Sequence, residues 1–73
     1  MKFSKEQTAS NLKTLRALHN YSQSDLANLS GVSCASIKGY EQGNVVMSLD
    51  VAVKIADALG CSVDSLVTEL TVA

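Results

Sequence analysis

The sequence predicts an all-α fold in which five short helices form one compact domain. Apolar residues recur at intervals of three and four positions and do not alternate over the length of a strand. Serine residues stand before the apolar segments, where a helix N-cap is expected, and glycine or asparagine follows several of them. A chain of 73 residues without proline has room for one core, so residues 1–73 are expected to form a single domain with short flexible ends.

The first helix is expected to start at Ser4 or Thr8 and to end near His19. Ser4 and Gln7 have the spacing of a capping box. Asn20 suits the left-handed turn that ends many helices. The apolar residues of this helix follow one another at three-residue intervals: Leu12, Leu15 and Leu18.

Two shorter helices follow. The second is expected from Ser22 to Gly31, with Asp25 in its first turn, where a negative charge is favourable. The third has Ser33 as its N-cap and Gly43 as its stop. The large apolar residues of these two helices are Leu26, Leu29, Ile37 and Tyr40.

The last two helices repeat this arrangement. The fourth begins at Ser48, with Asp50 in its first turn, and stops at Gly60. The fifth begins at Ser62, with Asp64 near its start. The apolar residues at helical spacing in these two helices are Leu49, Ala52, Val53, Ile55, Ala56, Leu59, Val63, Leu66 and Val67.

The connection between the second and third helices is the most informative local feature. Only Gly31, Val32 and Ser33 separate two helices of two to three turns each. A glycine-containing turn of this length predicts a helix-turn-helix motif over about residues 22–42. Gly31 permits the backbone angle of the turn, and the small Ala27 permits a close crossing of the helices.

The segment YSQSDLANLSGVSCASIKGYEQG, followed by SLDVAVKIADALGCSVDSL, resembles the lambda-repressor-like (Xre-type) helix-turn-helix DNA-binding domain. The resemblance covers about residues 9–68. It implies a compact five-helix domain, double-stranded DNA as the ligand and a two-fold homodimer. The third helix would then be the recognition helix in the major groove.

The resemblance also implies roles for individual residues. It places Gln23, at the start of the second helix, against a DNA phosphate and as a brace for the third helix. Arg16 and Glu41 match a pair that joins the first and third helices in this family. The other phosphate contacts implied are Ser22, Gln42 and Asn44. The residues implied to face base edges are Ser33, Cys34, Ala35, Lys38 and Gly39.

The stretch NVVM at residues 44–47 departs from the family pattern, which often has basic residues and a proline there. Its apolar residues are expected either to fold onto the core or to form a dimer or partner surface. The recognition positions also lack the Arg, Gln and Asn side chains that contact guanine and adenine with two hydrogen bonds. The candidate dimer contacts are Val45, Val46, Met47, Val63 and Val67.

Charge and cysteine content restrict the function less strongly. The net charge is −1, but residues 1–43 hold five of the six basic side chains and three of the seven acidic ones. This asymmetry is a weak indication of a polar partner at one end of the domain. Two cysteines without a matching set of histidines do not make a zinc site, and no cofactor is expected. Neither a signal peptide nor a membrane segment is visible, which favours a cytoplasmic protein with reduced thiols and no membrane partner.

These observations predict a sequence-specific DNA-binding transcription regulator, in the form of a homodimeric repressor. No base, nucleophile and orienting group occur at a usable spacing, so an enzyme is not expected. A domain that senses a small-molecule effector is not expected either. The alternative is a protein-interaction module of the antitoxin or anti-repressor type, with weak DNA binding or none.

Overall fold

Residues 4–68, the part of the chain that the computed structural model describes, contain five α-helices and no strand. The ends that the sequence predicts to be flexible lie outside this range. The all-α, five-helix prediction is confirmed. The helices are α1 (Lys5–Leu18), α2 (Gln23–Ser30), α3 (Cys34–Glu41), α4 (Leu49–Leu59) and α5 (Val63–Val67).

Serine N-caps and left-handed C-caps account for most of the helix boundaries. Each helix follows a serine with extended backbone, and in four of the five the serine hydroxyl accepts an N–H of the first turn. The exception is Ser48, whose hydroxyl bonds the Asp50 carboxylate instead. Gly31 and Gly60 end α2 and α4 with φ of 75° and 64°. Asn20, with φ of 59°, makes the left-handed turn after α1 that the sequence predicts.

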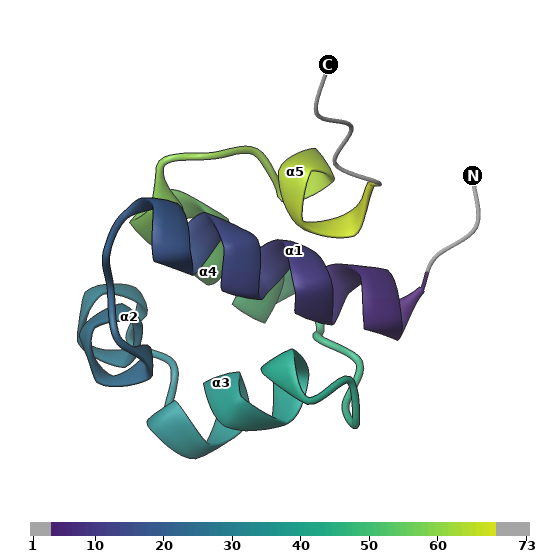
Figure 1. Ribbon diagram of the computed structural model, residues 1–73, viewed down its shortest axis with the longest axis horizontal. Helices are drawn as coiled ribbons and strands as arrows, with labels where there is room; N and C mark the ends of the chain where they lie inside the picture. Colours follow the sequence, from purple (N-terminus) through teal and green to yellow (C-terminus); the bar gives the residue numbers. More distant parts are fainter. Residues whose placement is uncertain (1–3, 69–73) are drawn as a thin grey trace.

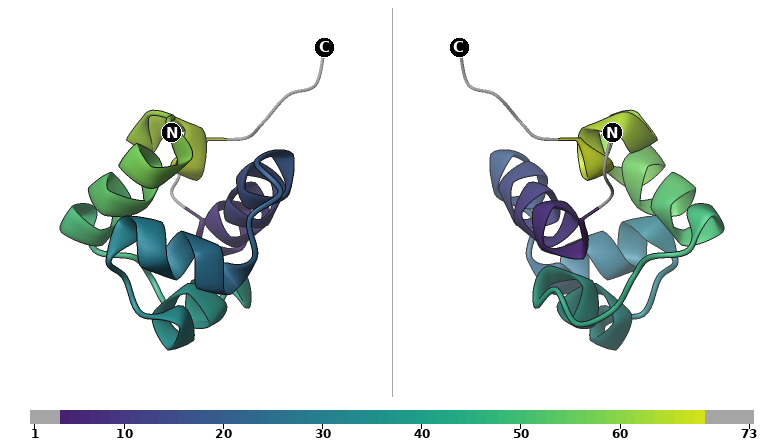
Figure 2. Two further views of the ribbon diagram at one scale, coloured as in Figure 1. Left: turned by 90° about the vertical axis from the view of Figure 1, so that its left-hand side faces the viewer. Right: turned by 90° about the vertical axis from the view of Figure 1, so that its right-hand side faces the viewer.

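The five helices enclose one core, to which each contributes at least one large apolar side chain. α1 packs against α3 and α5, α2 packs against α3 and α4, and α4 packs against α5. Figures 1 and 2 show α3 at one end of the molecule and α5 at the other, with α1 between them. The largest fully buried apolar side chains are Leu12, Leu26, Ile37, Ile55, Leu59 and Leu66.

Three leucines that the sequence analysis assigned to the apolar helix residues lie on the surface. Leu18 is 75% exposed, Leu29 57% and Leu49 73%. A step of three residues turns an α-helix by about 300°, so the side-chain direction shifts by about 60° at each step. From Leu12 to Leu18 the shift is about 120°, which carries Leu18 away from the core.

A buried asparagine joins the middle of α1 to the end of α5. Asn11 on α1 is 1% exposed and accepts a 2.9 Å hydrogen bond from Gln7 Nε2. Its own Nδ2 donates to the carbonyl of Leu66, at 3.0 Å, and to that of Thr68. Because the last carbonyls of a helix have no partner within the helix, Asn11 satisfies groups that would otherwise be buried and unbonded. Gln7 therefore bonds Asn11 and does not complete a capping box with Ser4.

Candidate nucleic-acid interface

The α2–turn–α3 unit has the geometry that the sequence predicts for a helix-turn-helix motif. Gly31 takes the left-handed conformation, and its N–H donates to the Ala27 carbonyl at 2.9 Å. Val32 then points into the core and is 8% exposed. Ser33 caps α3 by accepting the N–H of Ser36 at 3.2 Å. The turn thus fixes the crossing of two short helices through one glycine and one buried valine.

A buried carboxylate ties α3 to the rest of the motif. Glu41, in the last turn of α3, is 4% exposed. Its carboxylate accepts hydrogen bonds from Arg16 Nε at 2.7 Å and Arg16 Nη2 at 2.9 Å. Arg16 Nη1 also donates to the Tyr21 carbonyl at 2.8 Å. The structure therefore brings Arg16 and Glu41 together and joins α1, the α1–α2 loop and α3 in one network.

The charges of this network stabilise each other. Burial alone would raise the pKa of Glu41, but hydrogen bonds from Arg16 and Gln23, together with the positive charges of Arg16 and Lys13, outweigh burial and hold the pKa below its ordinary value. The hydrogen bond to Glu41 raises the pKa of Arg16. Both groups are therefore charged at neutral pH, although Glu41 has almost no contact with water.

Gln23 belongs to the same network. Its Nε2 donates to Glu41 Oε1 at 3.1 Å, which braces α2 against α3. Since a carboxylate only accepts hydrogen bonds, the amide nitrogen of Gln23 must face Glu41. The second N–H of that nitrogen remains for another acceptor. Sequence analysis assigned Gln23 a bracing contact and a phosphate contact; the structure contains the first, and the second stays a prediction.

Ser22 presents a different kind of polar group at the start of α2. Its hydroxyl oxygen accepts the Asp25 N–H at 3.0 Å, and its own N–H donates to the Asp25 carboxylate at 2.9 Å. This reciprocal capping box occupies the backbone amide of Ser22, while the hydroxyl proton can still be donated. The N–H groups of Gln23 and Ser24 lie in the first turn, where a helix supplies no acceptor.

Small side chains dominate the outward face of α3. Cys34, Ala35 and Lys38 are exposed, and Ala35 points about 160° away from the buried Ile37. Ser33 is also exposed, but its hydroxyl is bonded to Ser36 as the helix cap. Lys38 is the one long side chain among these four, so it is the one that can reach far from the helix.

Gly39 differs from the other predicted base-facing residues because it is half-buried. A Cβ atom at this position would lie 3.4 Å from Cγ2 of Val45, in the loop after α3. The family resemblance places Gly39 among the residues that face base edges. The structure adds an intramolecular contact, since a Cβ atom at residue 39 would touch the loop at van der Waals distance.

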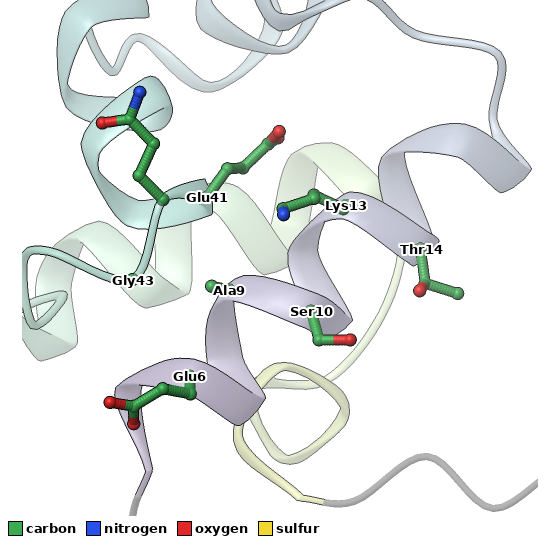
Figure 3. Close-up of a pocket in the computed structure, with 8 residues that line it drawn as sticks. Glu6, Ala9, Ser10, Lys13, Thr14, Glu41 and Gly43 are labelled. Atoms are coloured by element: carbon green, nitrogen blue, oxygen red, sulfur yellow. The ribbon is translucent and has the colours of Figure 1, made fainter.

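The loop after α3 carries the remaining predicted phosphate contacts. Gln42 and Asn44 are both exposed, and Asn44 Nδ2 donates to Gln42 Oε1 at 3.2 Å. Gly43 lies between them with φ of 73°. Beside them, a hollow of about 380 Å³ lies between α1 and the end of α3, and Lys13 and Glu41 are among the residues that line it (Figure 3). The Lys13 charge also favours the ionised form of Glu41.

The five candidate dimer residues do not share one environment. Val46 is 59% exposed, and Val45 packs on Gly39 while remaining 50% exposed. The other three pack against the core and are only partly buried: Met47, Val63 and Val67. NVVM therefore divides between the two alternatives, with Met47 on the core and Val46 on the surface. One turn of α4 adds two exposed apolar residues that the sequence analysis did not distinguish: Leu49 at 73% and Val53 at 51%.

Two cysteines and several acidic side chains lie among the described residues. Cys34 and Cys61 are both free thiols. Burial raises the pKa of the Cys61 thiol, which packs against the core. Within residues 4–68 no three His, Cys, Asp or Glu side chains are grouped so that they could hold a metal ion. None of the described helices has the length and apolar character needed to cross a membrane.

Comparison with known proteins agrees with this geometry. The family model described as Helix-turn-helix matches residues 12–66, which include every helix except the start of α1 and the end of α5. The chain belongs to this helix-turn-helix family. The predicted resemblance to lambda-repressor-like domains is thereby confirmed.

Several relatives carry regulatory names. An HTH-type transcriptional regulator of Methanocaldococcus jannaschii is 44% identical over 55 residues, which are 75% of this chain and 83% of that protein. The cryptic phage CTXphi transcriptional repressor RstR of Vibrio cholerae is 39% identical over 62 residues, or 85% of this chain and 52% of RstR. The chain spans only 15% of the HTH-type transcriptional regulatory protein of Pyrococcus abyssi, to which it is 46% identical over 46 residues.

The helix arrangement also occurs in a solved structure. The restriction-modification controller protein C.AhdI of Aeromonas hydrophila superposes with a TM-score of 0.82 at 32% sequence identity. The superposition covers 85% of this chain and 94% of C.AhdI. The five helices therefore reproduce nearly the whole of that protein's fold.

Proposed function

We propose that this helix-turn-helix protein is a sequence-specific transcription regulator that binds double-stranded DNA through α3. The observation that carries this proposal is the Glu41 network. Donors from Arg16 and Gln23 hold the end of α3 in a fixed position while the opposite face of the helix stays exposed. A recognition helix needs this combination, because it must enter the major groove as a rigid element.

Two classes of contact follow from the geometry. Ser22, Gln23, Gln42 and Asn44 would donate to phosphates at either end of the motif, and such contacts position the protein without reading sequence. Ser33, Cys34, Ala35, Lys38 and Gly39 would face the base edges. With so few long donors, discrimination would depend on thymine methyl groups, on Lys38 and on DNA shape.

We further propose that the protein acts as a homodimeric repressor. The repressor RstR is among its relatives, which supports this direction of control. The exposed apolar residues on and before α4, Val46, Leu49 and Val53, provide a surface that a second copy would cover. Two recognition helices would then bind half-sites about 34 Å apart along the duplex.

Selection of duplexes from a random library, followed by titration at several salt concentrations, tests the proposal. A DNA-binding regulator should enrich one sequence with two related halves, and its affinity should fall steeply as salt rises. The second candidate function, a protein-interaction module, is favoured by the short side chains of α3 and by the exposed apolar residues near α4. It predicts no enriched sequence and no salt-dependent duplex binding.

A further inference from the structure

The loop after α3 adds a side chain to the outward face of that helix. Cγ2 of Val45 lies 3.4 Å from the position that a Cβ atom on Gly39 would occupy. Gly39 follows the fully buried Ile37 by two residues, so its side-chain direction is about 160° from the core. Val45 therefore lies in van der Waals contact with the position from which an outward side chain of residue 39 would project.

Contacts on both sides fix the position of Val45. Before it, the Gly43 N–H donates to the Tyr40 carbonyl at 3.1 Å and the Asn44 N–H donates to the Gly39 carbonyl at 3.2 Å. These bonds fold the chain back over the end of α3 (Figure 1). After it, Met47 packs against the core. Half of the Val45 side chain nevertheless remains exposed.

The exposed part of Val45 is continuous with the proposed DNA-binding face. Ala35 lies one helical turn before Gly39 on the same side of α3 and is exposed. Ala35, Gly39 and Val45 thus form an apolar surface without a hydrogen-bonding side chain. The group in the major groove that such a surface suits is the 5-methyl group of thymine.

We propose that Val45 is a specificity-determining residue that contacts a thymine methyl group next to the C-terminal end of α3. This inference rests on the proposed DNA-binding function and assigns Val45 to the DNA, leaving the exposed residues of α4 to a second copy. Val46 provides a matched control. It is an exposed valine in the same loop, but none of its atoms lies within 4 Å of the position that a Cβ atom on Gly39 would occupy.

The test uses the duplex selected by the full-length protein, with each thymine replaced in turn by deoxyuridine, which lacks only the methyl group. The wild-type protein should lose about three- to fivefold in affinity at one position of each half-site, the effect of one buried methyl group. Val45→Ala should bind the thymine and deoxyuridine duplexes equally well at that position. Val46→Ala removes a residue of the proposed dimer surface, so any loss of affinity should be equal on the thymine and deoxyuridine duplexes and the wild-type difference should be retained.

Circular dichroism shows whether each variant is folded. If Val45→Ala is unfolded, Val45→Thr replaces it in the test, because threonine keeps the shape of the valine side chain. This variant should reduce the thymine preference at the same position. Failure to select any duplex would overturn the proposed function together with the inference. If a duplex is selected, three results would overturn the inference alone: no position of the duplex prefers thymine over deoxyuridine, Val45→Ala keeps the thymine preference, or Val46→Ala loses this preference as completely as Val45→Ala does.

Discussion

Replacing Arg16 by methionine should destabilise the domain by about 2–4 kcal/mol at pH 7. The substitution removes two hydrogen bonds to the Glu41 carboxylate and one to the Tyr21 carbonyl. Removing one partner of a buried ion pair costs about 3–5 kcal/mol, because the other charge stays buried without compensation. The expected cost is lower here, since Gln23 still donates to Glu41 and the Arg16 side chain is already 22% exposed.

The effect should depend on pH in a specific direction. In the wild-type protein the pKa of Glu41 is lowered, so its contribution to stability is present above the ordinary value of 4.5 and is lost as pH falls through the folded-state pKa. Without Arg16, burial becomes dominant and should raise the pKa of Glu41. Protonation of Glu41 would then relieve the variant, so the difference from wild type should be largest at neutral pH and shrink toward pH 4.

Urea unfolding followed by circular dichroism at pH 7, 5.5 and 4.5 measures these differences. Lys13→Met is the matched control, because Lys13 is an exposed cation on the same helix and makes no hydrogen bond to Glu41 in the described residues. It should change the free energy of unfolding by less than about 0.5 kcal/mol. The double variant Arg16→Met/Glu41→Gln should recover part of the loss, since no charge then remains buried. A loss for Arg16→Met that is equal at all three pH values would refute this explanation.

Four other changes test other parts of the structure. Asn11→Ala should cost about 1–3 kcal/mol in urea unfolding, because the buried Leu66 carbonyl loses its donor, whereas exposed Ser10→Ala should have little effect. Gln23→Ala should weaken binding to the selected duplex and to a random duplex by the same factor in filter binding, and loss at the selected site alone would make Gln23 a base contact. Lys38→Ala should cost about 1–3 kcal/mol and relax the preference at one guanine in an operator scan, and an unchanged preference would remove Lys38 from the base contacts. Leu49→Ser should produce monomers in analytical sedimentation at concentrations where the wild type is dimeric, and a monomeric wild type would contradict the proposed assembly.

The boundaries of the helices were predictable because local chemistry determines them. A serine hydroxyl reaches the N–H three residues ahead whatever the rest of the fold does, as at Ser4, Ser22, Ser33 and Ser62. Gly31 and Gly60 likewise mark positions where the backbone turns left-handed. These residues allowed the order of the helices to be read directly from the sequence.

The contacts that depend on the path of the chain were less accessible. The meeting of Arg16 with Glu41 was expected only from the family resemblance, because 25 positions separate them. Asn11 bonds carbonyls 55 and 57 positions away, and no local pattern indicates such a contact. Val45 was named as a candidate dimer contact, and its contact with Gly39 was not expected, since that contact follows from the fold of the loop after α3. The roles of these residues in DNA binding remain predictions.

The bare face of α3 also has an entropic consequence. Alanine and glycine have no rotamers to lose on binding, whereas each long, flexible side chain fixed in an interface costs about 0.5–1.5 kcal/mol. The Glu41 network removes a second source of loss, because the helix is already held in place before any ligand arrives. A domain built in this way obtains little energy from each contact but sacrifices little freedom to form it. Its affinity should therefore depend mainly on how well the shape of the DNA matches a rigid surface.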